Sequence, residues 1–113
     1  MQGSKYRNIR ADFNGRTYDS RKEMRRSAEL LFLQNVGVIE NLEYQVRFVL
    51  LDGYVNNKGE KIRPICYIAD FVYMDKERGR MVVEDTKGVR TEVYKIKKKM
   101  FEQRYPEYYF LET

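Results

Sequence analysis

Two apolar runs in the second half of the chain predict a pair of neighbouring β-strands. The first run spans residues 65–74 and the second spans residues 81–88. Pairing Tyr73 with Val82 leaves residues 76–79 as a four-residue loop, a common length for a β-hairpin. The hydrophobic pattern therefore predicts a hairpin in which residues 70 and 85 lie opposite each other.

The rest of the chain alternates between strand and helix patterns. The predicted strands are residues 9–13 and 16–18 around Asn14-Gly15, residues 43–51, and an edge strand at residues 108–111. The predicted helices are residues 21–35, capped by Asp19 or Ser20 and ended by Gly37, and a second helix capped by Thr91 and ending near residue 104. Polar residues 52–63 predict an exposed loop that touches substrate or moves.

Side-chain spacing predicts which face of each element is apolar. In the strand at residues 43–51, the residues expected on one face are Tyr44, Val46, Phe48 and Leu50. In the helices, the residues expected to face the core are Met24, Ala28, Leu31 and Phe32, then Val93, Ile96, Met100 and Phe101. Together these elements predict one α/β or α+β domain over residues 1–113, with residues 1–5 disordered and a central sheet covered by helices from both halves of the chain.

The charge of the chain favours an anionic partner. Its formal net charge is +5, and its cations gather at residues 21–26 and 95–99. Nucleic acid is a better fit than a membrane, because the chain has no lipid-anchoring motif, signal pattern or apolar run that could span a bilayer. The alternative is that both clusters are solvated helix faces. We expect a soluble, intracellular protein.

Absent residue types restrict the chemistry. The chain has no histidine, which excludes serine-histidine and cysteine-histidine nucleophiles and histidine-bound zinc. Its single cysteine, Cys66, lies in an apolar strand and is expected to be a buried packing residue. No phosphate-binding glycine loop is present, so no nucleotide cofactor is expected. Carboxylates, lysines and tyrosines remain for catalysis.

Asp70 stands out because it is a charged residue inside the most apolar run. Burying a carboxylate there is costly unless it is paired or bound, and the hairpin register sets it opposite a second carboxylate, Asp85. A divalent cation would relieve that repulsion. Asp70, Asp85 and the backbone carbonyl of Thr86 are the expected ligands of Mg²⁺ or Mn²⁺, which prefer oxygen donors. The alternative is that one or both acids form structural salt bridges.

An acid on one strand of a hairpin and acid-any-lysine on the next resembles the PD-(D/E)XK nuclease superfamily. The matching residues are Asp70 and the run Asp85-Thr86-Lys87, with Ala69 in place of the name-giving proline. The order of elements from about residue 6 onward is also similar, and the chain looks like a phage-encoded branch of small, largely uncharacterised members. Its layout resembles Holliday-junction resolvases and transposon end-cleaving nuclease subunits.

This resemblance implies a restriction-endonuclease-like core, a mixed sheet whose catalytic hairpin is flanked by helices. Lys87 shares a face with Asp85 and is expected to act in catalysis, whereas a solvated strand end is the alternative. Glu23 matches the helical acid of the superfamily, although Ser20 to Glu23 also forms a capping box. Glu84 points away from Asp85 and is expected at the surface or in an ion pair, unless a register shift of one residue exchanges the two roles.

Several residues are candidates for contacts with nucleic acid. They are Lys95, Lys98 and Lys99 in the second helix, Arg21 in the first, and Gln45, which matches a glutamine of several relatives. The bland alternatives are solubilising lysines and an ordinary outward-facing glutamine. Tyr67, Tyr73 and Tyr94 can stack on bases, but core packing is the commoner role of such tyrosines.

The expected function is a Mg²⁺- or Mn²⁺-dependent DNA endonuclease that acts on branched DNA in phage recombination or DNA processing. The branched substrate rests on the resemblance alone. We expect a homodimer whose interface uses the first hairpin or residues 108–111, and we expect it in the cytoplasm of a bacterial host. The alternatives are a non-cutting nucleic-acid-binding protein on the same fold and a nuclease subunit that needs a partner.

Overall fold

The structure of the chain is a computed structural model that describes residues 11–13, 15–86 and 90–113. The predictions that residues 1–5 are disordered and that the first strand begins at residue 9 lie outside the described residues. Lys87 also lies outside them. Among the described residues, no helix is long and apolar enough to cross a membrane.

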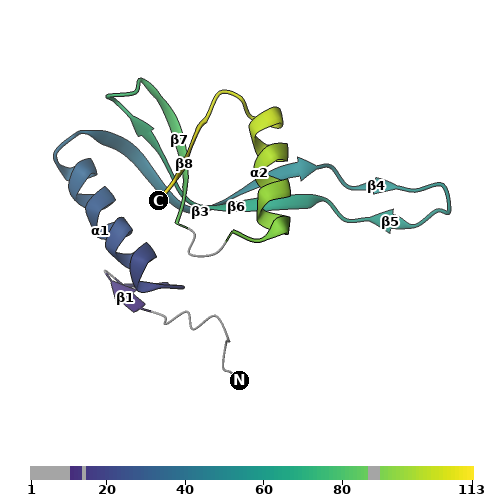
Figure 1. The fold of residues 1–113 in the computed structure, drawn as a ribbon, viewed down its shortest axis with the longest axis horizontal. Helices are drawn as coiled ribbons and strands as arrows, with labels where there is room; N and C mark the ends of the chain where they lie inside the picture. Colours follow the sequence, from purple (N-terminus) through teal and green to yellow (C-terminus); the bar gives the residue numbers. More distant parts are fainter. Residues whose placement is uncertain (1–10, 14, 87–89) are drawn as a thin grey trace.

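A four-stranded mixed sheet forms the centre of the part of the chain that the structure describes (Figure 1). Its strands follow the order β3, β6, β7 and β8, with bounds Ile39–Leu51, Ile65–Asp75, Arg80–Asp85 and Tyr109–Glu112. The pairs β3 with β6 and β6 with β7 are antiparallel, whereas β7 and β8 are parallel. The expected mixed sheet and the expected edge strand are therefore both confirmed.

The hairpin of β6 and β7 has the predicted register from Phe71 with Glu84 to Asp75 with Arg80, and the pairing stops one residue short of the predicted pair of residues 70 and 85. Tyr73 pairs with Val82, and Asp75 pairs with Arg80. The Asp75 side chain accepts a hydrogen bond from the Glu77 amide at 2.9 Å, the local contact by which aspartate favours a turn. Because the strand pairing follows from the apolar pattern and the loop length, the sequence alone was enough to place it.

Both predicted helices are present, and they cover opposite faces of the sheet. Helix α1 spans Arg21–Asn35 with Ser20 as its N-cap, and α2 spans Glu92–Arg104 with Thr91 as its N-cap. Val82 packs in a cluster with Leu30 of α1, while its neighbour Val83 packs in a cluster with Phe101 of α2. Successive strand residues point to opposite faces, so the two helices sandwich β7 between them.

The inward face of each helix differs from the predicted one. In α1 the buried residues are Glu23, Ser27 and Leu30, whereas Phe32 is 63% exposed. Ser27 faces inward because its hydroxyl and the Tyr18 hydroxyl share a hydrogen bond of 2.6 Å. A satisfied polar pair can be buried as readily as an apolar one, which the apolar spacing does not reveal.

In α2 the predicted Phe101 is buried and the predicted Met100 packs against the same cluster, whereas Tyr94 is buried in place of Val93 and Ile96, which are exposed. The rotation of the helix follows from Tyr94, whose ring packs in the core while its hydroxyl donates to Glu112 on β8 at 2.6 Å. An amphipathic tyrosine satisfies both environments at once, which a β-branched side chain at position 93 cannot do.

Strand β3 changes the face that it buries at Gln45. Val46, Phe48 and Leu50 pack on the α2 side, but Tyr44 packs with Phe71 on the α1 side. The prediction that all four side chains share one face is therefore wrong. Gln45 has a φ of +52°, in the left-handed region, and this backbone turn reverses the alternation.

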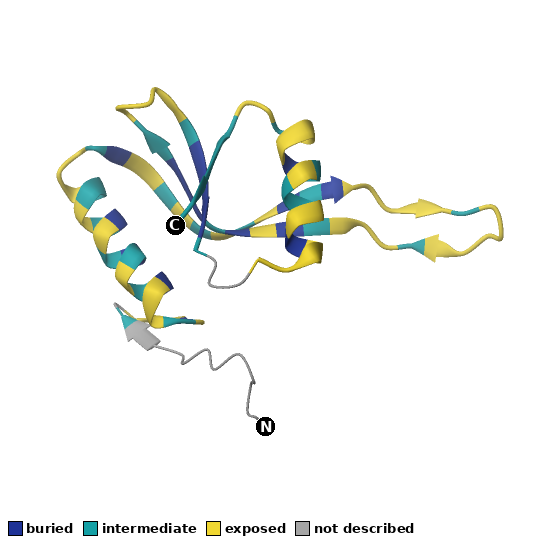
Figure 2. Cartoon of the chain, in the orientation of Figure 1, coloured by how far each residue is buried: buried dark blue, intermediate teal, exposed yellow. Residues whose placement is uncertain are grey.

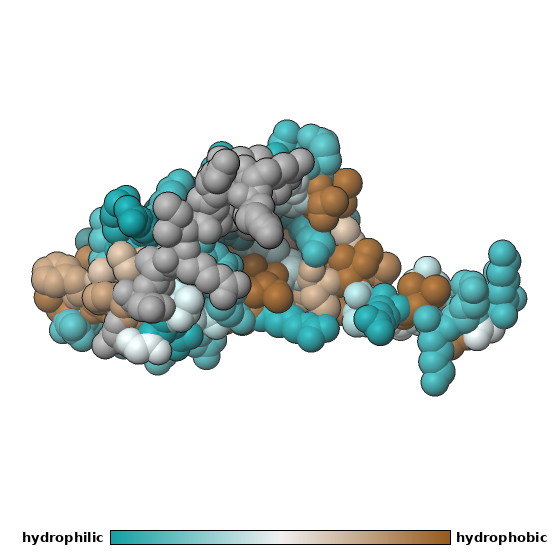
Figure 3. Space-filling model, turned by 90° about the horizontal axis from the view of Figure 1, so that it is seen from below, coloured by the Kyte–Doolittle hydropathy of each residue, from teal (hydrophilic) through white to brown (hydrophobic). Residues whose placement is uncertain are grey.

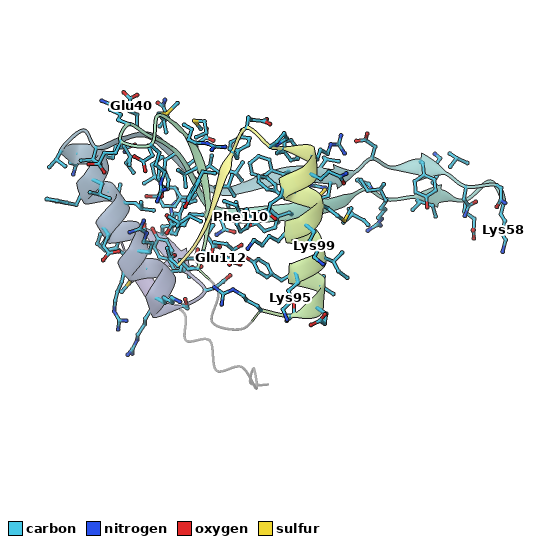
Figure 4. All side chains as sticks on the ribbon, turned by 45° about the horizontal axis from the view of Figure 1, so that its top comes forward. Glu40, Lys58, Lys95, Lys99, Phe110 and Glu112 are labelled. Carbon is cyan, nitrogen blue, oxygen red and sulfur yellow. The ribbon has the colours of Figure 1, made fainter. Side chains whose placement is uncertain are left out.

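Residues 52–63, predicted as an exposed loop, are exposed and form an arm that contains two short strands. Strands β4 (Tyr54–Val55) and β5 (Lys61–Ile62) pair as a hairpin that projects from the body, with Lys58 near its tip (Figures 1 and 4). The arm is mostly exposed, as expected (Figure 2), and its apolar side chains contribute to the scattered apolar surface in Figure 3. The Asn56 side chain organises the tip by accepting from the amides of Lys58 and Glu60.

The first hairpin pairs β1 (Ala11–Phe13) with β2 (Arg16–Tyr18), as the Asn14-Gly15 signal predicts. Cys66 differs from its prediction. It is partly exposed on β6, and its sulfur accepts a hydrogen bond from Arg47 at 3.2 Å. It lines an open pocket between β6 and α2 together with Val93 and Lys97, so the apolar run around Cys66 does not guarantee burial.

Candidate functional site

Asp70 lies at the end of the β6–β7 pairing, where its carboxylate is held from the opposite strand end. Its Oδ2 atom accepts from the Thr86 amide at 2.8 Å and from the Thr86 hydroxyl at 3.0 Å. The carboxylate is only half-buried, so a ligand can reach it. These two contacts tie the first acid of the sequence pattern to the segment that carries the second.

Gln45 connects Asp70 to the first helix. Its Nε2 atom donates to Glu23 Oε2 at 3.0 Å and makes a longer contact of 3.5 Å with Asp70 Oδ1. The three side chains come from α1, β3 and β6, and the left-handed backbone of Gln45 places its amide between the two carboxylates. A non-glycine residue in this conformation costs about 1 kcal/mol or more, and such strain concentrates at functional sites.

Glu23 takes part in the N-cap of α1 through its backbone and contacts Gln45 through its side chain. Its backbone amide donates to the Ser20 hydroxyl at 3.1 Å, which is the capping contact. Its side chain is nevertheless buried and turned toward Gln45. The capping residues therefore fix the start of the helix and, with it, the place of the Glu23 carboxylate beside the Asp70 region.

Asp85 is fully buried and accepts a hydrogen bond from the Tyr67 hydroxyl. Burial raises the pKa of Tyr67, and the charges of Asp85 and Asp70 raise it further, so this hydroxyl keeps its proton and remains a donor. Thr86, the chain neighbour of Asp85, bonds Asp70, so both acids belong to the same end of the β6–β7 hairpin. Tyr67 thus has a structural and electrostatic role instead of an exposed stacking role.

Glu84 is buried, which corrects the expectation of a surface position and confirms the alternative of an ion pair. Arg26 binds it through two nitrogens, and it also accepts from the hydroxyls of Tyr73 at 2.6 Å and Thr113 at 3.0 Å. The observed register leaves Glu84 on the α1 side, so the exchange of roles with Asp85 does not occur. A buried, fully paired carboxylate of this kind joins α1 to the sheet.

Of the residues predicted to contact nucleic acid, some are paired with carboxylates of the protein and others are exposed. Lys98 bonds Glu112 at 3.1 Å and lies 5.4 Å from the centre of the Phe110 ring, while Lys95 pairs with Glu92. Lys99 and Arg21 are exposed. Lys98 therefore already has a structural partner on β8, whereas Gln45 belongs to the carboxylate cluster and not to a separate basic surface.

The donor chemistry of the cluster fits a hard divalent cation, because Glu23, Asp70 and Asp85 offer only oxygen atoms. In the described residues, however, no group of three or more histidine, cysteine, aspartate or glutamate side chains is placed to hold a metal. Protein donors hold all three carboxylates instead. The contact from Gln45 to Asp70 Oδ1, at 3.5 Å, is at the long limit for a hydrogen bond and therefore holds that oxygen weakly.

Sequence reasoning missed two parts of this site. The first is the Tyr67 hydroxyl that holds Asp85, and the second is the left-handed backbone at Gln45. Tyr67 lies three residues before Asp70 in the same apolar run, but no local pattern links it to a residue on the next strand. A positive φ at a glutamine has no sequence signal.

Comparison with known proteins gives a family but no characterised relative. No curated protein and no solved structure matches the chain. Residues 3–111 match the family described as "Protein of unknown function (DUF1064)", so the chain belongs to that family.

Proposed function

We propose that the protein is a metal-dependent DNA endonuclease that hydrolyses phosphodiester bonds. The observation that carries this proposal is the bond from Thr86 to Asp70 at the end of the β6–β7 hairpin. It supports the acid and acid-any-lysine geometry that the sequence pattern requires. Gln45 bonds the Glu23 carboxylate, which comes from α1 and agrees with the helical acid expected from the resemblance.

Each residue of the candidate site would have a separate role in this reaction. Asp70, Asp85 and Glu23 would hold Mg²⁺ or Mn²⁺, which when bound supplies Lewis acidity at the phosphoryl oxygens. Tyr67 keeps Asp85 oriented, and Thr86 keeps Asp70 oriented. Lys87, two residues beyond Asp85 in the sequence, would stabilise the negative charge that develops on the phosphate during hydrolysis.

The finer proposals rest on the resemblance. They are a restriction-endonuclease-like core, a branched DNA substrate such as a four-way junction, action in phage recombination or DNA processing, a homodimer, and a location in the bacterial host cytoplasm. The net charge of +5 supports an anionic substrate but carries no information on its geometry.

A second candidate function is a basic nucleic-acid-binding protein that keeps this fold without cutting. The observation in its favour is that protein donors already bond the Oδ2 atoms of Asp70 and Asp85, and that no group of metal ligands is preformed in the described residues. A related possibility is a nuclease subunit that cuts only with a partner.

The deciding experiment incubates the purified protein with labelled linear duplex, single strand, flap and four-way junction DNA. Each substrate is tested with Mg²⁺, with Mn²⁺ and with EDTA. The nuclease proposal expects cleavage with a metal and none with EDTA. Tight binding of all substrates without cleavage under any condition would favour the non-cutting protein, and selective cutting of one substrate would identify the geometry.

A further inference from the structure

A small basic pocket lies beside the candidate site on the side of α1. Its volume is about 220 Å³, and it is lined by Lys22, Arg25, Arg26, Glu29, Thr86 and Thr113. Thr86 is the residue whose amide and hydroxyl hold Asp70. The pocket is therefore connected through Thr86 to the carboxylate on which the proposed chemistry depends.

The four α1 residues of this pocket form one stripe, because positions 22, 25, 26 and 29 follow the spacing of neighbours on a helix. Within the stripe, Arg26 is committed to structure. Burial alone would lower the pKa of Arg26, but its bonds to Glu84 raise it, so its charge is held by a buried partner. It also bonds the Glu29 carboxylate at 3.2 Å.

Lys22 and Arg25 have no such commitment. Both are exposed, and in the part of the chain that the structure describes neither has a carboxylate partner. Helix stability does not explain Lys22 either, because a cation in the first turn interacts unfavourably with the helix dipole. Their charges are thus available to an anion that enters the pocket.

We propose that Lys22 and Arg25 bind backbone phosphates of the DNA strand that passes Asp70, with the Thr86 and Thr113 hydroxyls lining the same pocket. This inference rests on the proposed nuclease function and names the surface that holds its substrate. Phosphate is the anion that fits, since compact tetrahedral oxyanions accept from ammonium, guanidinium and hydroxyl donors together. On this proposal α1 is the main contact surface, and the lysine stripe of α2 stays a prediction that its own variant tests.

The test measures DNA affinity in EDTA, where no cleavage occurs, with a labelled linear duplex over a range of salt concentrations. Three double variants each remove two cations: Lys22→Ala/Arg25→Ala in the pocket, Lys95→Ala/Lys99→Ala on α2, and Lys58→Ala/Lys61→Ala on the arm as a charge-matched control. A fourth variant, Lys22→Arg/Arg25→Lys, keeps the charge. Thermal melting is recorded for all four.

The pocket variant should bind DNA about tenfold more weakly or worse. The slope of its log affinity against log salt concentration should become shallower by about 2, one for each lost phosphate contact. The charge-keeping variant should retain this slope. The melting temperature of the pocket variant should not fall, since no described partner is lost. The α2 and arm variants should lose less affinity.

An equal loss of DNA affinity in the arm control would refute the proposed phosphate site, because a general effect of net charge would then explain the result. Unchanged binding by the pocket variant would also overturn it, and metal-dependent cleavage by the wild type would still support the nuclease. Conversely, a wild type that binds through Lys22 and Arg25 but cuts no DNA with either metal would keep the phosphate site and end the nuclease proposal.

Discussion

Gln45 donates a hydrogen bond from its side-chain amide to the buried carboxylate of Glu23 at 3.0 Å, from a backbone with a φ of +52°. The same residue marks the point where β3 changes the face that it buries. One glutamine thus shapes the strand and positions an acid from the first helix. Both effects can be separated by mutation.

Gln45→Ala and Gln45→Gly both remove the amide, but only glycine tolerates the left-handed conformation without strain. We expect Gln45→Gly to be more stable than Gln45→Ala by about 1 kcal/mol in chemical denaturation. Both should lose nuclease activity to a similar extent, because each leaves Glu23 without this donor. Equal stability of the two variants would show that the backbone at this position carries no strain.

Asp70→Asn and Asp85→Asn should each abolish metal-dependent cleavage while the fold is kept. An asparagine oxygen can still accept from Thr86 or from Tyr67, so only the charge is lost. DNA affinity in EDTA should stay the same or rise, since a carboxylate repels phosphate. Cleavage and circular dichroism are the two measurements, and full activity in either variant would refute the site.

Lys87→Ala should lower the cleavage rate by a factor on the order of 10², as expected for the loss of one electrostatic group that stabilises the transition state. Metal binding measured by calorimetry should survive. Loss of metal affinity in a folded variant would instead assign Lys87 to the organisation of the site.

Stability should fall in acid through Glu112. The Tyr94 hydroxyl, together with Lys98 and Arg90, lowers the pKa of Glu112 to about 2, from its ordinary value of 4.5. A depressed pKa in the folded state stabilises the fold above pH 4.5, and this contribution is lost as the pH falls from about 4.5 toward 2.

Glu112→Gln should therefore destabilise the protein at neutral pH by an amount on the order of 2 kcal/mol, and much less near the acidic end of this range. Denaturation curves at several pH values measure the difference. The matched control is Glu102→Gln, at an exposed carboxylate on α2. A pH-independent difference for Glu112→Gln would show that packing alone explains its effect.

The protein should be a homodimer, because paired cuts in a four-way junction require two sites related by a two-fold axis. Strand β8 lies at an edge of the sheet, which keeps it available as the predicted interface, alongside the first hairpin. Light scattering at micromolar concentration, with and without junction DNA, measures the mass. A monomer in both conditions would redirect the substrate toward nicks, flaps or cuts made with a partner.

The sequence by itself determined the elements that depend on local chemistry. The register of β6 with β7 follows from an apolar pattern and a loop length, and the helix starts at Ser20 and Thr91 follow from capping side chains. Because these signals lie within a few residues of the structure that they specify, they can be read without the fold.

Tertiary structure decided which side chains meet. The burial of Ser27 depends on Tyr18, that of Glu84 on Arg26 and Tyr73, and the position of Asp85 on Tyr67. Each pair joins different elements, so the free energy of burial depends on a partner that no local pattern names. A buried polar group is stable only when such a partner is in place, and only the folded chain supplies it.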